Sequence, residues 1–109
     1  TKAVGFTGSY NGGKQLFDWA NQRKDPIPVF AEMGSVNPVY LLPEKLQLPT
    51  SEIAMMYASS VTLGVGQFCT NPGLIIGIES DALQTFINDL GKAITKTTPS
   101  PMLHAGMAK

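Results

Sequence analysis

A single cysteine, Cys69, is the residue of this sequence best suited to nucleophilic chemistry. It lies among small and polar residues in the segment 66–73 (GQFCTNPG), not inside an apolar run. Gly66 and Gly73 on either side allow a loop tight enough to present the sulfur atom. A nucleophilic thiol needs a nearby base or surroundings that stabilise its thiolate. The alternative is that Cys69 is a small buried hydrophobic residue, as many lone cysteines are.

Glu32 is the candidate general base. It follows the apolar residues 29–31 and is expected to end a strand. A carboxylate in that place faces partial burial, which favours its protonated form and suits it to proton abstraction near neutral pH. The alternative is an exposed charge at the end of a strand. The other acidic residues lie near turns or on polar helix faces and read as solvated charges: Asp18, Asp25, Glu44, Glu52, Glu79, Asp81 and Asp89.

Two glycine-rich segments suggest phosphate or dinucleotide binding. Residues 8–14 (GSYNGGK) match G-x-x-x-x-G-K, but Gln15 stands where a P-loop needs Ser or Thr to hold magnesium. Glycines between a strand and a helix still let backbone N–H groups approach an anion, so phosphate binding and a plain tight turn both remain open. Residues 64–69 begin like G-x-G-x-x-G, but Cys69 replaces the last glycine and a helical pattern precedes it, which argues against a dinucleotide fingerprint.

The counts of cysteine and histidine limit metal and disulfide chemistry. With one of each, the chain can form neither an internal disulfide framework nor a Cys-rich metal site. We therefore expect no metal. His104 lies in a tail without a clear predicted fold and reads as a surface or packing residue. Nothing in the sequence supports a pair between His104 and Cys69.

The composition is that of an ordinary globular domain, with 109 residues, 43% hydrophobic and 15% charged. Lys+Arg and Asp+Glu are both 8, and the charges are scattered, which sets aside nucleic acid and membrane surfaces as partners. No apolar run reaches the about 20 residues that span a bilayer. No signal peptide is visible at the N-terminus, so we expect a cytoplasmic location.

Strands and helices are predicted to alternate along the chain. The predicted strands are 3–7, 27–33, 39–42 and 74–78. This alternation predicts an α/β fold. Four strands are too few to specify a closed sheet, and the first begins almost at the start of the chain. We therefore expect a piece of a larger protein.

Three helices are predicted to position the candidate residues. The first follows the glycine-rich turn 8–13. The second is capped by Thr50 or Ser51 and ended by the glycines in 64–66, and the third is capped by Ser80. Their predicted apolar faces are, in order, Leu16, Phe17 and Ala20; Ile53, Met56, Tyr57 and Val61; and Leu83, Phe86, Ile87, Leu90 and Ile94.

Three segments together resemble the aldehyde dehydrogenase superfamily. Residues 6–9 (FTGS), with Gly13 following, match its cofactor-binding turn. Residues 30–38 (FAEMGSVNP) match its glutamate motif, and residues 66–69 (GQFC) match its cysteine motif. Each motif alone is weak, but all three occur in the right order and at fitting separations. The resemblance spans nearly the whole chain.

Details of the motifs point to one branch of this superfamily. Met33 and Ser35 replace the Leu and the second Gly of the usual glutamate motif. Together with residues 67–73, they are similar to the α-ketoglutarate semialdehyde (2,5-dioxopentanoate) dehydrogenase branch. The resemblance implies a small-molecule aldehyde as substrate, with α-ketoglutarate semialdehyde as a candidate, and NADP or NAD as cofactor.

The resemblance also implies residue roles. The Cys69 thiolate attacks the aldehyde, hydride transfer leaves a thioester, and Glu32 activates the water that hydrolyses it. The backbone N–H of Cys69 holds part of the oxyanion. The implied cofactor-binding residues are Gly8, Ser9, Gly13 and Met33. The first three belong to the turn that receives the pyrophosphate, and the backbone of Met33 lies near the nicotinamide.

The resemblance places a domain boundary within the chain. Residues 1–33 would end a Rossmann-type cofactor-binding domain, and residues 34–109 would begin the catalytic, thiol-bearing domain. The parent would be several times longer and a homo-oligomer. We expect the isolated chain to be inactive, because other catalytic and cofactor-binding residues of the superfamily are absent. Two alternatives stay open: an acylating relative that passes its thioester to coenzyme A or phosphate, and a catalytically dead structural or interaction module.

Overall fold

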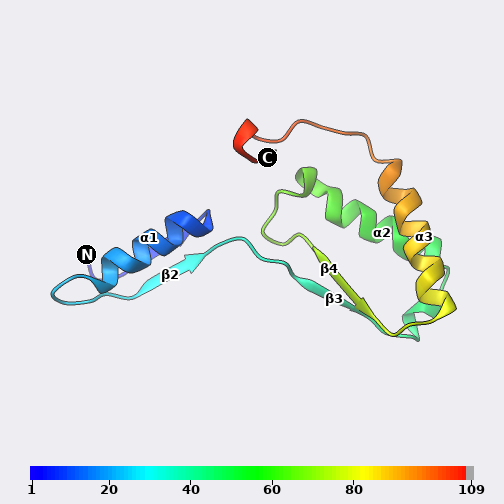
Figure 1. Cartoon of the computed structure of the whole chain (residues 1–109), viewed down its shortest axis with the longest axis horizontal. Coiled ribbons are helices and arrows are strands. Elements are labelled where there is room, and N and C mark those ends of the chain that lie inside the picture. Colours follow the sequence, from blue (N-terminus) through cyan, green and yellow to red (C-terminus); the bar gives the residue numbers. More distant parts are fainter. Residues whose placement is uncertain (108–109) are drawn as a thin grey trace. The chain divides into compact units, whose positions relative to one another are not determined.

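A computed structural model describes residues 1–107 and confirms a mixed α/β chain with small parallel sheets. It divides into two compact units, Thr1–Ser35 and Val36–Lys109, each built around one pair of parallel strands (Figure 1). The division falls close to the boundary predicted after Met33. The assignment of the two parts to a cofactor-binding and a catalytic domain stays a prediction.

The first unit is a strand–helix–strand arrangement. Strand β1 (Val4–Thr7) pairs in parallel with β2 (Val29–Glu32), and helix α1 (Tyr10–Asn21) connects them. The Gly8 N–H donates to the Glu32 carbonyl at 3.0 Å, which extends the pairing by one residue. β2 begins later than predicted, because Pro28 has no N–H to donate to a ladder. The two strands otherwise match the predicted ones.

Helix α1 begins earlier than predicted, at Tyr10, so Gly12 and Gly13 lie inside its first turn rather than in a preceding loop. Two features of the N-terminal end of α1 account for this earlier start. The Ser9 hydroxyl accepts the Gly12 N–H at 3.2 Å and caps the helix. A Cβ atom at Gly13 would lie 2.6 Å from the Met33 sulfur, so the missing side chain permits close packing of α1 on the strand side of the unit.

The second unit joins two strands through a longer connection. Strand β3 (Pro38–Leu41) pairs in parallel with β4 (Leu74–Gly77). The 3-10 helix η1 (Lys45–Gln47), helix α2 (Thr50–Thr62) and the turn η2 (Leu63–Gly66) lie between them in sequence. Helix α3 (Asp81–Thr95) follows β4 and lies against α2 (Figure 1), and a short 3-10 turn, η3 (Ala105–Met107), ends the described chain.

Phe86 of α3 is the centre of the core of the second unit and is fully buried. The buried residues clustered with it are Leu41, Leu46, Ile53 and Ala54. The ring of Tyr57 meets the Phe86 ring edge to face, with centroids 6.4 Å apart. Such a pair adds about 0.5–1.5 kcal/mol beyond its buried area.

The predicted helix faces are partly wrong in this unit. Met56 is 70% exposed, and α2 instead buries the small residues Ala54 and Ala58 beside Ile53. Ile87 and Ile94 of α3 are also exposed, whereas Phe86 is buried as predicted. A 3.6-residue period shows which side of a helix is apolar, but the neighbouring helix decides how much of that side is covered.

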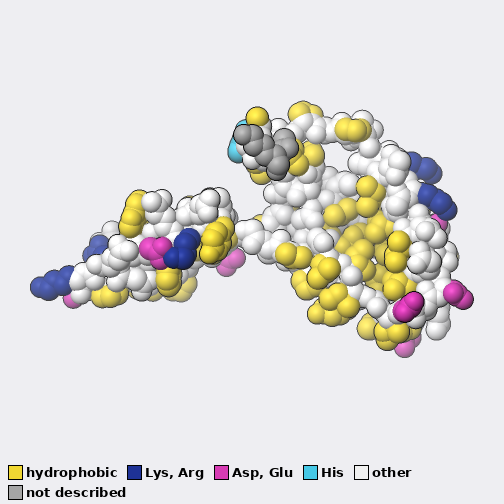
Figure 2. Space-filling view, viewed as in Figure 1, with side chains coloured by type: hydrophobic (Ala, Val, Ile, Leu, Met, Phe, Trp, Pro, Cys, Tyr) yellow, Lys and Arg dark blue, Asp and Glu magenta, His cyan; other side chains and the backbone are white. Residues whose placement is uncertain are grey.

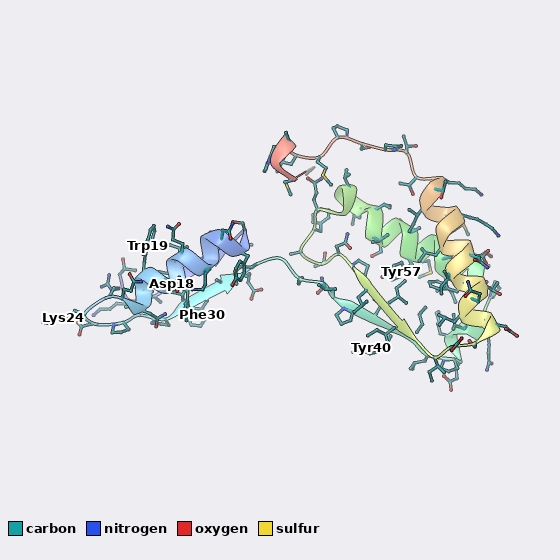
Figure 3. The ribbon with its side chains drawn as sticks, viewed as in Figure 1. Asp18, Trp19, Lys24, Phe30, Tyr40 and Tyr57 are labelled. Carbon is teal, nitrogen blue, oxygen red and sulfur yellow. The ribbon has the colours of Figure 1, made fainter. Side chains whose placement is uncertain are left out.

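Both faces of the β3–β4 pair are apolar. Leu41 is buried and Ile75 packs against the core cluster. The alternate residues that point the other way are exposed, namely Tyr40, Leu42, Leu74, Ile76 and Ile78. Figure 2 shows hydrophobic side chains gathered over this unit, and Figure 3 labels Tyr40 on β3. Parallel strands apolar on both faces are typical of sheets covered on both sides.

The two long helices of this unit start differently. The Ser80 hydroxyl accepts the Leu83 N–H at 3.2 Å, so the predicted cap of α3 is confirmed. The cap predicted for α2 is wrong, because Pro49 stands at the N-cap without a side-chain bond. Thr50 instead donates its hydroxyl to Asp89 at 2.8 Å and links α2 to α3. The neighbouring helix offers Thr50 a charged acceptor that no local pattern reveals.

Within residues 1–107, no helix is long and apolar enough to cross a membrane. The same residues contain no group of three or more His, Cys, Asp or Glu side chains placed to hold a metal ion.

Replacing Ser80 by Ala should lower the free energy of unfolding by about 1 kcal/mol, because the Leu83 N–H loses its acceptor. Urea unfolding followed by circular dichroism measures the change. Ser80→Thr is the matched control, since threonine keeps a hydroxyl that can accept the Leu83 N–H and should therefore lose much less stability. Equal losses in the two variants would show that the hydroxyl does not cap α3.

Candidate functional site

Cys69 lies in the loop between η2 and β4, and it is exposed. The predicted loop is therefore confirmed, and in this chain Cys69 is not part of the buried core. Exposure leaves the thiol accessible to a substrate, as a nucleophile requires. Its role as a nucleophile stays a prediction.

The loop begins with an unusual backbone. Gly64, Val65 and Gly66 all have positive φ, at 57°, 59° and 71°. Glycine adopts this conformation readily, but a β-branched residue such as Val65 does so only under constraint, at a cost on the order of 1–3 kcal/mol. The two glycines end the helical stretch as predicted. No sequence pattern indicates that Val65 shares their conformation.

Side chains on either side of Cys69 tie the loop down. The Asn71 amide donates to the carbonyls of Val61 at 2.8 Å and Gly66 at 3.2 Å. The Gln67 amide donates to the Gly64 carbonyl at 2.7 Å. These bonds fold residues 61–71 back upon themselves. Sequence reasoning missed both residues, although amide side chains beside glycines are a common sign of such turns.

Two further residues hold the loop from outside it. The amide of Asn37 donates to the carbonyls of Cys69 at 2.6 Å and Asn71 at 3.1 Å. The hydroxyl of Tyr57, a residue labelled in Figure 3, donates to the Pro72 carbonyl. The loop is thus attached to the segment before β3 and to α2. Neither attachment was predicted from the sequence.

The tail of the second unit also reaches the loop. The Leu103 N–H donates to the Gln67 side-chain oxygen at 2.9 Å. His104, the next residue, is exposed, and its ring nitrogen accepts the Gly106 N–H at 3.2 Å. This agrees with the surface role predicted for His104.

Glu32 ends β2 as predicted, but its side chain is exposed rather than partly buried. The pleat explains this correction, because successive residues of a strand point to opposite faces. Ala31 lies against Gly13 of α1, so Glu32 points the other way and shares the outer face with Phe30, which is 69% exposed. Glu32 lies in the first unit and Cys69 in the second, so their predicted convergence stays a prediction.

The four residues predicted to bind cofactor all lie in the first unit. Gly8 joins β1 to the cap residue Ser9. Gly13 packs against Met33, as described above. The ring of Phe6 also covers this turn, since a Cβ atom at Gly8 would lie 2.7 Å from it. A side chain at Gly8 or Gly13 would have to displace the ring of Phe6 or the side chain of Met33, so phosphate binding and a plain tight turn both remain open.

Two curated relatives match the chain over nearly all of its length. The alpha-ketoglutaric semialdehyde dehydrogenase 2 of Azospirillum brasilense is 49% identical over 107 residues, 98% of this chain. The alpha-ketoglutaric semialdehyde dehydrogenase of Acinetobacter baylyi is 47% identical over 108 residues, 99% of this chain. The predicted resemblance to the aldehyde dehydrogenase superfamily is confirmed.

The chain spans about a fifth of the length of these curated relatives, since each match covers 20% of the relative. The likeness therefore concerns one segment of an aldehyde dehydrogenase. The matched stretch includes the predicted glutamate and cysteine motifs and the turn before α1. No family model matches the chain.

Tyr57, which attaches the loop to α2, should make the stability of the chain depend on pH. Burial raises the pKa of Tyr57 above its ordinary value of 10.0, so the folded chain favours the neutral phenol. Its contribution to stability is complete below that ordinary value and is lost as pH rises through the raised pKa. The urea midpoint of the chain should therefore fall more steeply above about pH 10 than that of Tyr57→Phe.

Tyr40→Phe is the matched control, because Tyr40 is 66% exposed. This variant should keep the pH dependence of the unsubstituted chain. The same pH dependence in Tyr57→Phe and the unsubstituted chain would contradict the role assigned to burial.

Proposed function

We propose that the chain is the cysteine- and glutamate-bearing segment of an NAD(P)-dependent aldehyde dehydrogenase, an oxidoreductase that converts an aldehyde to a carboxylic acid. The observation that carries this proposal is the near-complete match to two proteins named as semialdehyde dehydrogenases. The structure also supports the proposal, because Cys69 is exposed and hydrogen bonds hold its loop in place.

The proposed reaction has two stages centred on the Cys69 sulfur. In the first, the thiolate adds to the aldehyde carbon and gives a thiohemiacetal, whose oxyanion the Cys69 N–H helps to stabilise. Loss of a hydride from that carbon leaves a thioester. When bound, an oxidised nicotinamide cofactor accepts this hydride.

The second stage releases the acid. Glu32 accepts a proton from water as the water attacks the thioester, and the carbon–sulfur bond breaks to return the Cys69 thiolate. The exposed carboxylate of Glu32 can meet solvent water directly. This stage requires Glu32 and Cys69 to approach one another in the parent. Glu32 is also the feature that favours hydrolysis over transfer to coenzyme A or phosphate.

The first unit has features that suit an anionic cofactor. Helix α1 starts directly after β1, Ser9 caps it, and its first turn carries no acidic side chain. Such a helix end favours negative charge through its unpaired N–H groups. We infer that Gly8, Ser9 and Gly13 lie at the pyrophosphate site and that Met33 lies near the nicotinamide.

The proposal extends to the rest of the parent. Residues 1–33 would end its Rossmann-type cofactor-binding domain, and residues 34–109 would begin its catalytic domain. α-Ketoglutarate semialdehyde is the first substrate to test, because both relatives carry its name. A homo-oligomer, a cytoplasmic location and the inactivity of the isolated chain remain predictions of the same proposal.

The full-length parent tests the nucleophile. Cys69→Ala should reduce NADP or NAD reduction with an aldehyde by at least about 1000-fold, because no other cysteine of this segment can form the thioester. Absorbance of the reduced cofactor at steady state measures this loss. Ser60→Ala, an exposed change on α2, is the control and should keep normal turnover. Substantial turnover by Cys69→Ala would defeat the proposed function.

The second stage can be tested separately from the first. Glu32→Gln should leave a rapid first turnover of reduced cofactor and slow the following steady state by about 100- to 10,000-fold, because only hydrolysis loses its base. Stopped-flow measurement of reduced cofactor separates the two phases. Glu44→Gln, an exposed residue of the second unit, is the matched control. Equal slowing of both phases would contradict the role of Glu32.

A further inference from the structure

We propose that Asn37 is a positioning residue for Cys69, a role that rests on the proposed function and deepens it. Asn37 does not carry the chemistry itself. Its side chain holds the peptide that follows the reactive sulfur and so restricts the directions in which the thiol can point.

The side-chain amide of Asn37 donates hydrogen bonds to two backbone carbonyls of the loop. Its nitrogen lies 2.6 Å from the Cys69 oxygen and 3.1 Å from the Asn71 oxygen. An amide nitrogen carries two hydrogens, so one side chain can serve both acceptors at once. Because the peptide group is planar, holding the Cys69 carbonyl also fixes the Thr70 N–H and limits rotation about ψ of Cys69. The Cys69 side chain is thereby limited to fewer orientations.

The backbone of Asn37 has an unusual conformation and is anchored through both neighbouring residues. Its φ is +46°, a left-handed conformation that asparagine tolerates better than most residues. The residue before it, Val36, accepts the Gly73 N–H at 2.7 Å, and the residue after it, Pro38, pairs with Leu74. Asn37 is therefore held on both sides by the parallel pair. From that fixed base its amide reaches the loop.

Other residues already maintain the shape of the loop. Asn71 and Gln67 close it internally, and Tyr57 binds the Pro72 carbonyl. The hydrogen bond from Asn37 differs from these in reaching the carbonyl of Cys69 itself. Loss of the Asn37 amide should therefore leave the loop folded but allow Cys69 to move.

Asn37→Gly and Asn37→Asp in the full-length parent test this inference. Glycine keeps the positive φ without a side chain, and aspartate keeps the shape but cannot donate. Each should lower kcat by about tenfold or more, as expected for the loss of hydrogen bonds. KM for the aldehyde and the cofactor dissociation constant should change by less than about threefold. The rate of iodoacetamide alkylation of Cys69, followed against pH, should also differ from the unsubstituted protein.

Asn88→Asp is the matched control, because Asn88 is an exposed residue of α3. It should leave kcat and the alkylation profile unchanged. Thermal unfolding of each variant shows whether the protein is folded. If only one of the two Asn37 variants folds, that variant decides the question alone.

Two outcomes overturn the inference without touching the proposed function. One is a folded Asn37 variant with unchanged kcat and alkylation profile, while Cys69→Ala is inactive. The other is failure of both variants to fold, since Asn37 would then be needed for the fold and not for the position of Cys69. Turnover by Cys69→Ala would instead defeat the proposed function, whatever the Asn37 variants do.

Discussion

The parallel pairing of β3 with β4 is the interaction on which the second unit depends. Parallel strands cannot be joined by a tight turn, so the chain must cross over between them, and α2 with its flanking turns supplies that crossover. The same pairing brings the segment before β3 beside the segment before β4. The hydrogen bond from the Gly73 N–H to the Val36 carbonyl continues the pairing beyond the two strands, and the Cys69 loop ends there. The position of the thiol is thus a consequence of strand pairing and not of the loop alone.

The first unit uses the same geometry on a smaller scale. β1 and β2 pair in parallel, α1 crosses over between them, and the crossover starts at a turn of small residues. Gly13 lets the helix approach Met33, and Gly8 makes room for the ring of Phe6. These contacts favour small residues in this turn whether or not an anion binds there. A site for a pyrophosphate group and a closely packed turn are compatible uses of the same residues.

The second unit combines exposed apolar surface with strained backbone. The outer face of β3 and β4 carries exposed residues such as Tyr40 and Ile76, as in a parallel sheet meant to be covered on both sides. The chain spans about a fifth of the length of its curated relatives. The left-handed backbone of Val65 lies close to Cys69 in the sequence. Strained residues of this kind often cluster at functional sites.

Local features were determined by the sequence itself. The strands, the loop around Cys69, the cap at Ser80 and the resemblance of three motifs to aldehyde dehydrogenases all depend on residues close together in the chain. Tertiary structure alone decided the rest. It turned Glu32 outward, gave Thr50 a partner on another helix, and brought Asn37 to the Cys69 carbonyl across 32 positions. Periodicity and capping act within a few residues, whereas these contacts depend on which elements pack together, and no local pattern encodes that.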